Sequence, residues 1–169
     1  KKVFEKYPDK FPLLIKFLDV NDRLSIQVHP SDEVAMKKHN EFGKSESWYI
    51  VYASDDATLI LGTKPGVTKE KFLEKVKNND FSDLFEERSV KTGDFIDITP
   101  GTVHASLKGS VIFAEIQQSS DVTYRIYDFD RIDKDGKKRE LHLDNAADVI
   151  DFEKKVEIKN TNFQNGENK

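Results

Sequence analysis

Short apolar or aromatic runs, separated by glycine and proline corners, dominate the second half of the chain. Their length and their β-branched and aromatic residues are typical of strands, because a helix of ordinary length would not fit between such corners. Many short strands joined in this way predict a mainly β fold, and in particular a barrel. The predicted strands are 94–98, 103–107, 111–116 and 124–127.

The first half of the chain mixes strands with helices. Ser31 and Thr68 are favourable N-caps, and each precedes a segment with an acidic first turn or helical spacing. The sequence Lys-Asp-Gly-Lys at 134–137 is typical of a hairpin turn. We therefore expect strands at 13–18 and 24–29, a helix from 32 to about 39, a hairpin formed by 48–52 and 58–61, a helix at 69–78, a helical turn at 81–86 and a last helix at 145–152.

Composition limits the classes of function. Lys and Arg number 27 against 31 Asp and Glu, a formal net charge of −4, so no overall positive field attracts nucleic acid or a membrane. No apolar run approaches the roughly 20 residues of a membrane-spanning helix. The chain has no cysteine, which excludes disulfides and thiolate-bound zinc. With 169 residues, one cytoplasmic domain without an obligate protein partner is the simplest expectation.

Three separated segments each offer a metal ligand. Gln27 and His29 are two residues apart on a predicted strand, so their side chains point to the same face. Glu46 opens an apolar run and His104 follows a Pro-Gly turn, which places both at strand ends where loops leave room for a ligand. Two imidazoles, one carboxylate and one amide suit zinc or a similar divalent ion with positions left open for substrate.

Several ordered motifs follow one another along the chain. They are the run from Phe11 to Asp19, Leu24-Ser-Ile-Gln-Val-His-Pro30, Gly43-Lys-Ser-Glu-Ser-Trp-Tyr49, Ile98-Thr-Pro-Gly-Thr-Val-His-Ala105 and the run from Glu115 to Phe129. Together they resemble the motifs of the type I mannose-6-phosphate isomerases, particularly the short bacterial form. The resemblance runs from about Phe11 to Leu143 and is far more specific than one short pattern.

The resemblance implies a cupin-type jelly-roll barrel that binds one Zn²⁺ per chain through Gln27, His29, Glu46 and His104. The common cupin signature has two histidines and a nearby glutamate in one motif. Here Gln27 stands in place of the first histidine, and Glu46 follows an inserted helix, as the isomerase family shows. Proteins of this kind carry more sequence at both ends, so we expect 1–156 to be a metal-binding isomerase domain without its N-terminal part. Residues 157–169 would be a linker towards a C-terminal β-domain outside this chain.

The same resemblance implies three catalytic residues. Arg125 would line the pocket and stabilise an enediolate with its fixed positive charge. Lys44 and Asp121 would lie near the reacting carbons, and either one suits ring opening or proton transfer if burial shifts its pKa. Each residue also has a simpler interpretation, because Arg125 can brace Asp128, and Lys44 and Asp121 can be loop charges.

The implied reaction interconverts mannose 6-phosphate and fructose 6-phosphate through a cis-enediol, and two alternatives remain open. Two histidines and one carboxylate also form the site of non-haem iron oxygenases, although Gln27 and Arg125 argue against that class. A non-catalytic metal- or sugar-binding cupin module is the other alternative. His39 and His142 are expected on the surface outside the site, and Glu115 can face either the pocket or water.

Overall fold

The computed structural model describes residue 5 and residues 11–161, which form two antiparallel sheets and three helices. The first sheet has the strand order β1-β8-β3-β6-β10 and the second has the order β5-β4-β7-β2-β9. All strand pairs in both sheets are antiparallel, so the predicted mainly β fold is confirmed. The strands are β1 (Leu13–Val20), β2 (Ile26–Val28), β3 (Glu46–Ala53), β4 (Thr58–Thr63), β5 (Phe85–Ser89), β6 (Asp94–Ile98), β7 (His104–Lys108), β8 (Val111–Gln118), β9 (Tyr124–Tyr127) and β10 (Ile158–Asn160), and the helices are α2 (Asp32–His39), α3 (Lys69–Lys77) and α4 (Leu143–Val149).

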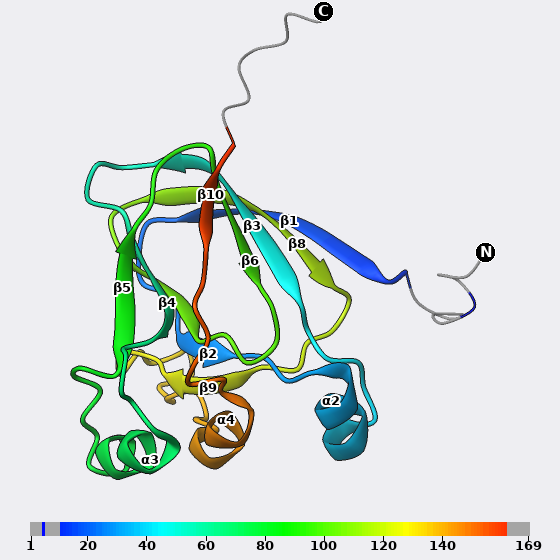
Figure 1. Ribbon diagram of the computed structural model, residues 1–169, viewed down its shortest axis with the longest axis vertical. Coiled ribbons are helices and arrows are strands. Elements are labelled where there is room, and N and C mark those ends of the chain that lie inside the picture. Colours follow the sequence, from blue (N-terminus) through cyan, green and yellow to red (C-terminus); the bar gives the residue numbers. More distant parts are fainter. Residues whose placement is uncertain (1–4, 6–10, 162–169) are drawn as a thin grey trace, which may run out of the picture.

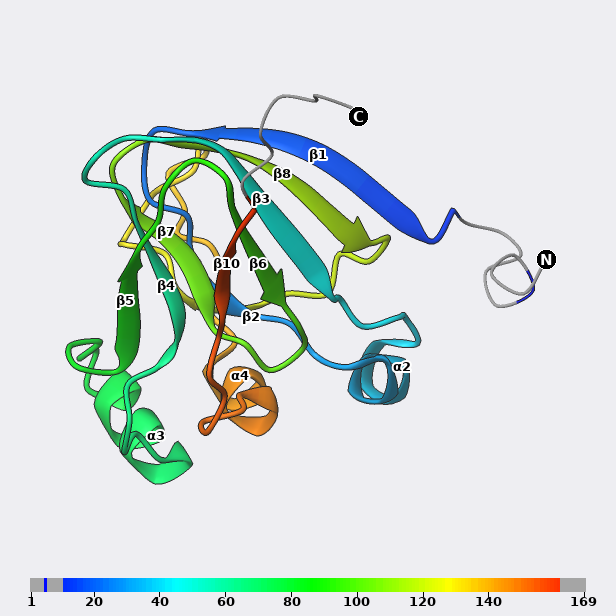
Figure 2. The ribbon, with the colours of Figure 1, turned by 45° about the horizontal axis from the view of Figure 1, so that its top comes forward.

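The two sheets face each other and enclose an interior that is apolar along one part of its length (Figures 1 and 2). Alternation along β3 shows how this arises, because Glu46, Trp48 and Ile50 are buried while Ser47 and Tyr49 between them are only partly buried. The apolar part contains Val20, Trp48, Ile50, Ala57, Leu59, Leu61, Val90, Ile96, Ile98, Val111, Phe113 and Val156.

A second apolar cluster lies on the opposite face of the second sheet. Strand residues such as Ile26, Val28 and Ile60 pack there against Phe72 of α3 and Ala146 of α4. Figures 1 and 2 show the helices gathered on this side of the molecule. The second sheet is therefore covered on both faces, and this fixes which of its side chains point into the interior between the sheets.

Local helix signals in the sequence are confirmed. The Ser31 hydroxyl accepts a hydrogen bond from the Val34 amide at the start of α2, and the Thr68 hydroxyl accepts one from the Lys71 amide at the start of α3. The turn at 134–137 is also present, with Gly136 at a φ of 75°. The last helix, α4, starts at Leu143 and ends at Val149, earlier at both ends than expected.

Two predictions are wrong. The runs 48–52 and 58–61 do not pair as a hairpin, because β3 lies in the first sheet beside β6 and β8, and β4 lies in the second beside β5 and β7. The connection between β3 and β4 turns the chain from one sheet to the other, and both strands point apolar residues into the same interior. The helical turn expected at 81–86 is also absent. Asp83 has a φ of 55°, which no α-helix accepts, and β5 starts at Phe85.

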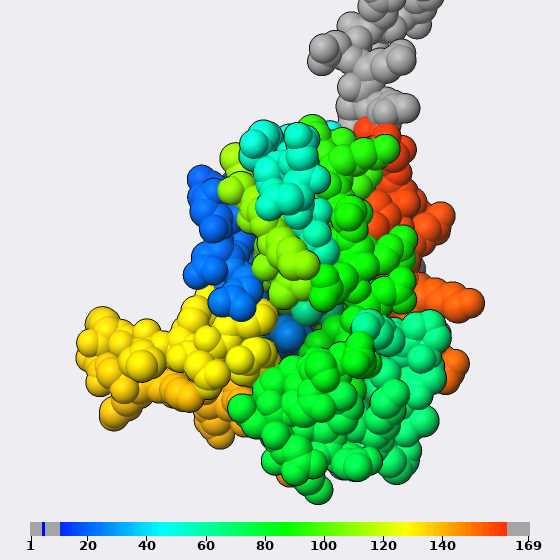
Figure 3. Space-filling model, turned by 90° about the vertical axis from the view of Figure 1, so that its left-hand side faces the viewer, coloured from blue at the N-terminus to red at the C-terminus, as the bar shows by residue number. Residues whose placement is uncertain are grey.

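Residues near both ends of the described chain take part in sheets. β1 is the edge strand of the first sheet, and β10 pairs with β6 at the other edge. The proposed boundary at 156/157 stays a prediction, although Ile158–Asn160 belong to this sheet. Beside β9, the segment that follows it, coloured yellow, projects from the body in Figure 3. Among the described residues, no helix has the length and apolar character needed to cross a membrane.

Candidate metal centre

His29, Glu46 and His104 meet in the interior between the two sheets. His29 follows β2 directly, Glu46 is the first residue of β3 and His104 is the first residue of β7, so strand starts from both sheets contribute. One possible ligand atom from each residue lies within 4.8 Å of the others, and all three residues are buried. The sequence prediction that these residues lie together at strand ends is confirmed.

The groups that face one another at this point are polar and lack hydrogen bonds. Nε2 of His104 lies 3.2 Å from Oε1 of Glu46, and Nε2 of His29 lies 3.7 Å from Oε2 of Glu46. Within the described part of the chain, neither Nε2 atom and neither carboxylate oxygen has a hydrogen-bond partner. Burying four such atoms is costly unless something else binds them, and a cation satisfies all four at once.

Backbone contacts fix the orientation of both imidazoles. Nδ1 of His29 lies 3.1 Å from the carbonyl oxygen of Val122, and Nδ1 of His104 lies 2.9 Å from that of Thr102. A carbonyl oxygen can only accept, so in each neutral ring the proton is on Nδ1 and the lone pair of Nε2 points towards Glu46. This is the arrangement of metal-binding histidines, whose second nitrogen donates to a carbonyl or carboxylate.

Charges around the three residues favour the protonation states that bind a metal. Burial, the neighbouring His104 and Lys44 hold the pKa of His29 well below its ordinary value, with Glu46 offsetting part of the effect. Burial raises the pKa of Glu46, but His104, His29 and Lys44 together outweigh it and leave that pKa below its ordinary value. At neutral pH the site therefore offers a neutral imidazole and a carboxylate, which suit a borderline ion such as Zn²⁺.

Strand register places Gln27 and Arg125 beside His104. Gln27 lies directly opposite His104 on one side and opposite Arg125 on the other, and directly opposite residues in antiparallel strands point to the same face. Leu61, which is also opposite His104, belongs to the apolar part of the interior. Gln27 and Arg125 thus share the inner face of the second sheet with His104, and the role of Gln27 as a fourth ligand stays a prediction.

Lys44 is buried, with Nζ 3.3 Å from Oε2 of Glu46, so the structure brings this predicted residue to the centre. Asp121 has a different setting. It is exposed, and it lines a surface pocket of about 360 Å³ together with His39, Tyr124 and His142. Its neighbour Val122 provides the carbonyl that orients His29, so Asp121 lies close to the site in sequence, and its catalytic role stays a prediction.

A polar network that sequence reasoning did not assign extends the site along β8. Glu115 is buried and accepts hydrogen bonds from Nζ of Lys16 at 2.8 Å and from Nε1 of Trp48 at 3.2 Å. The Trp48 ring in turn packs edge-on against His104, with 5.5 Å between centroids. The alternation of Glu115, Ile116 and Gln117 indicated that the two polar side chains share a face, but only the structure shows that this face points inward.

Comparisons with known proteins find similar sequences among the mannose-6-phosphate isomerases. A family model described as phosphomannose isomerase type I, catalytic domain, matches residues 1–49, which include Gln27, His29 and Glu46. Mannose-6-phosphate isomerase ManA of Bacillus subtilis is 46% identical over 144 residues, covering 85% of this chain and 45% of that protein. Mannose-6-phosphate isomerase of Streptococcus mutans is 46% identical over 140 residues, covering 83% of this chain and 44% of that protein.

The fold agrees as well. The crystal structure of mannose 6-phosphate isomerase from Bacillus subtilis superimposes with a TM-score of 0.78 at 40% identity, covering 84% of this chain and 45% of that chain. The chain spans about half the length of the curated relatives it matches. Over that half of their length, the chain is similar in sequence and in fold to the type I mannose-6-phosphate isomerases.

Proposed function

We propose that this chain carries the metal-dependent isomerase centre that interconverts mannose 6-phosphate and fructose 6-phosphate. One observation carries the proposal: the buried Nε2 atoms of His29 and His104 and the carboxylate of Glu46 converge without hydrogen bonds in a chain 46% identical to mannose-6-phosphate isomerases. The proposed metal is one Zn²⁺ per chain, with Gln27 as the fourth ligand. The proposed substrate is a soluble sugar phosphate, and cytoplasmic location fits that substrate.

The proposed reaction moves one proton between adjacent carbons of the open-chain sugar. A base takes the proton from C2 of mannose 6-phosphate, a proton is delivered to C1, and the hydroxyl proton of O2 is lost while O1 gains one. Negative charge develops on O1 and O2 in the cis-enediol stage, so the site must supply positive charge there. A bound divalent zinc ion supplies Lewis acidity at these oxygens.

Arg125 is the proposed second source of positive charge. It shares a strand face with Gln27 and His104, and its Nε is buried without a hydrogen-bond partner among the described residues. An arginine stays protonated in such a setting, even though burial and the neighbouring Arg139 lower its pKa. Its free Nε–H is therefore the donor that we assign to the developing oxyanion.

Lys44 and Asp121 are the proposed groups for ring opening and proton transfer. Lys44 has the stronger support because its ammonium group is buried beside Glu46, close to where a sugar would meet the metal. Asp121 is exposed, so its proposed role requires that the sugar extend to the rim between β8 and β9. Proton exchange at carbon is assigned to no single residue.

The test is proton NMR of mannose 6-phosphate with the zinc-loaded chain, alongside the same chain treated with chelator. We expect fructose 6-phosphate to appear with zinc and not with chelator. Arg125→Ala should lower turnover by about a hundredfold or more while leaving zinc content unchanged, because it removes charge stabilisation without removing a ligand. Arg23→Ala is the matched control, because this arginine packs over the Phe129 ring on the surface.

The outcomes separate the competing functions. A folded, zinc-bound chain that does not convert the sugar would support a binding module, or a half-length unit that needs the rest of its relatives' sequence. Purification with iron, together with oxygen consumption on a sugar substrate, would support the oxygenase alternative. Turnover that survives Arg125→Ala would remove this residue from the mechanism.

A further inference from the structure

Arg125 lies on β9, at an edge of the second sheet where no further strand pairs with it. β9 is the edge strand of the second sheet, and β2 covers one of its sides. The other side of Arg125 meets the chain at Glu140 and His142, between the projecting segment after β9 and the start of α4. This segment therefore takes the place of a neighbouring strand.

His142 meets Arg125 through two complementary hydrogen bonds. The backbone amide of His142 donates to the carbonyl of Arg125 at 2.7 Å, and the backbone amide of Arg125 donates to Nδ1 of His142 at 3.1 Å. In an ordinary antiparallel pair both acceptors are carbonyls, so here an imidazole nitrogen replaces one of them. Because Nδ1 accepts, the ring is the neutral form with its proton on Nε2.

The guanidinium is held by the same segment. NH1 of Arg125 donates to the carbonyl of Glu140 at 3.0 Å, and this leaves the buried Nε of Arg125 as a free donor. His142 thus holds the backbone of Arg125, and Glu140, two positions earlier in the chain, holds the tip of its side chain. The Glu140 contact restricts the rotamer of the Arg125 side chain, and the His142 contacts fix the backbone from which this side chain starts, so together they set the direction of Nε.

Anchors on both sides keep this segment in place. Upstream, Arg139 and Arg131 bind the buried carboxylate of Asp128, and NH1 of Arg131 also donates to the carbonyl of Arg23 at 2.7 Å. Downstream, His142 is the residue before α4, whose Ala146 and Ala147 are buried against the second sheet. The side chain of His142 makes no capping bond in α4, so its Nδ1 is available to Arg125.

We propose that His142 is a positioning residue: its imidazole Nδ1 and backbone amide, with the carbonyl of Glu140, hold Arg125 so that Nε points into the site. This inference rests on the proposed catalytic role of Arg125, but the contacts themselves can be tested without activity. The sequence offered no signal for it, because His142 stands between two leucines with the spacing of a surface residue.

The first test is heteronuclear NMR of the isotope-labelled, metal-free chain. We expect the His142 ring to be the Nε2–H tautomer, and we expect the Arg125 Nε–H signal to show restricted motion. In His142→Leu the Arg125 signal should become mobile, whereas in His142→Asn it should stay restricted, because the Asn oxygen lies near the position of Nδ1. An Nδ1–H tautomer, or an Arg125 signal equally mobile in the wild type and in His142→Leu, would overturn the proposal.

The second test is steady-state isomerase kinetics with zinc-loaded variants. We expect His142→Leu to lower kcat by about tenfold to a hundredfold with a smaller change in KM, since a displacement of about 1 Å at the reacting atoms has an effect of this size. His142→Asn should recover most of kcat. His39→Leu is the matched control, because this histidine lines the same surface pocket but contacts the Tyr124 hydroxyl, at 2.8 Å, rather than Arg125.

The two tests distinguish failure of the inference from failure of the proposed function. If the wild type has no turnover but the NMR results are as expected, His142 positions Arg125 and the isomerase assignment for this chain fails. If the wild type is active and His142→Leu keeps kcat within about twofold, the positioning role fails. Equal losses in the Leu and Asn variants would also overturn it, since bulk rather than the hydrogen bond would then matter. Circular dichroism and zinc content confirm that each variant is folded and loaded.

Discussion

The interior between the two sheets has an apolar part and a polar part that share the same strands. Along β3, Glu46 belongs to the polar part, while Trp48 and Ile50 belong to the apolar part. Along β8 the order is reversed, with Phe113 in the apolar part and Glu115 in the polar part, because the strands are antiparallel. The same backbone scaffold thus carries two environments a few residues apart.

The two parts differ in how well their atoms are satisfied. In the apolar part, side chains such as Leu59 and Ile96 are fully buried against one another, so their contribution is packing and removal of surface from water. In the polar part, buried atoms of His29, Glu46 and His104 lack hydrogen bonds among the described residues. Polar atoms without hydrogen bonds add little to folding stability, so we expect the apolar part to contribute most of the stability and the polar part to determine metal binding.

The largest effect should come from Glu46→Gln. The amide removes the negative charge of the site, so zinc content and turnover should fall by at least about a hundredfold, more than the loss of a residue that only orients a ligand. In chelator, the loss in free energy of unfolding should be smaller than for a truncation in the apolar part, because neither carboxylate oxygen has a hydrogen bond to lose and only the ion pair of Glu46 with Lys44, at 3.3 Å, is removed. Elemental analysis and urea denaturation measure the two quantities. Strong destabilisation in chelator would show that the polar part also supports the fold.

The reverse result is expected for Leu59→Ala. Leu59 is 0% exposed in the apolar part, so truncation should lower the free energy of unfolding by about 2–5 kcal/mol through lost burial and a residual cavity. Zinc bound per folded chain should stay at the wild-type value. Val51→Ala, at a side chain that is 40% exposed, is the matched control with a much smaller expected loss. Loss of zinc from folded Leu59→Ala would contradict the expectation that the apolar part determines stability and the polar part determines metal binding.

Features that depend on neighbouring residues could be predicted from the sequence, whereas features that depend on strand pairing could not. Caps such as Ser31 and Thr68 act within a few residues, and alternation shows which residues share a face, so both were predictable. Which strands pair with each other could not be predicted, because β3 and β4 show the same alternation of buried and exposed residues whether they form a hairpin or face each other across the interior. The ligand positions came from a resemblance that covers several motifs.

Residues that act through contacts with distant parts of the chain gave no local signal. Lys16 reaches Glu115 from an edge strand 99 positions away in sequence, and alternation cannot tell which face of an edge strand is buried. His142 was expected on the surface, and it is in fact partly exposed. Its contact with the Arg125 amide depends on the path of the chain after β9. Contacts of this kind require the tertiary structure.

Trp48→Phe tests the border between the two parts, where intermediate effects on both quantities are expected. The Trp48 ring stacks on Phe113 at 4.3 Å and donates through Nε1 to the buried Glu115. Phenylalanine keeps most of the packing but removes the donor, so the free energy of unfolding should fall by about 1–3 kcal/mol. Zinc affinity, measured by competition with a chelating dye, should fall less than in Glu46→Gln. An unchanged affinity would confine the role of Trp48 to packing.

The pH dependence of the free energy of unfolding should distinguish the polar part of the interior from the apolar part. The folded-state pKa of His29 is lowered, so in acid the unfolded chain takes up a proton at this residue that the folded chain does not. Stability is therefore fully present above the unfolded value of about 6.5 and is lost as pH falls below it, by up to about 1.4 kcal/mol per pH unit. Urea denaturation in chelator at pH about 7.5 and about 5.5 should show this loss, and His29→Asn should reduce it. Equal losses in both proteins would exclude His29 as the cause.

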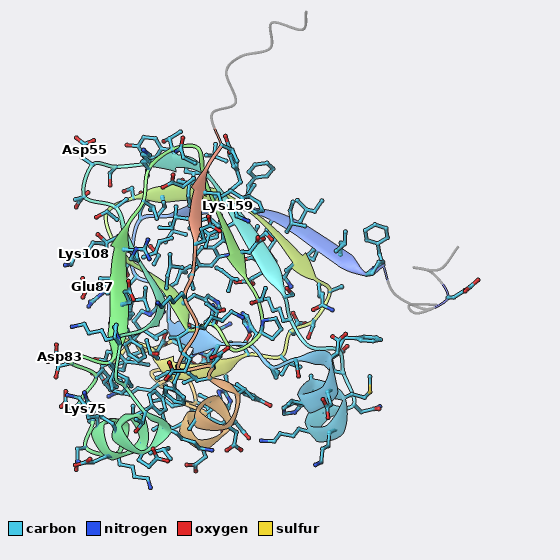
Figure 4. The ribbon with its side chains drawn as sticks, in the orientation of Figure 1. Asp55, Lys75, Asp83, Glu87, Lys108 and Lys159 are labelled. Carbon is cyan, nitrogen blue, oxygen red and sulfur yellow. The ribbon has the colours of Figure 1, made fainter. Side chains whose placement is uncertain are left out.

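The smallest effect is expected outside the interior altogether. Glu87 on the edge strand β5 and Lys108 at the end of β7 lie with Asp55, Asp83 and Lys75 along the same side of the molecule (Figure 4). Lys108 Nζ and Glu87 Oε2 are 3.4 Å apart, and both side chains are more than half exposed, at 62% and 51%. Water and salt screen such a pair, so Glu87→Gln should change the free energy of unfolding by less than about 0.5 kcal/mol and leave zinc binding unchanged. Urea denaturation at low and high salt measures this directly. A loss above about 1 kcal/mol would mean that the edge of β5 stabilises the barrel as much as some interior contacts do, and the contrast between interior and surface would then need revision.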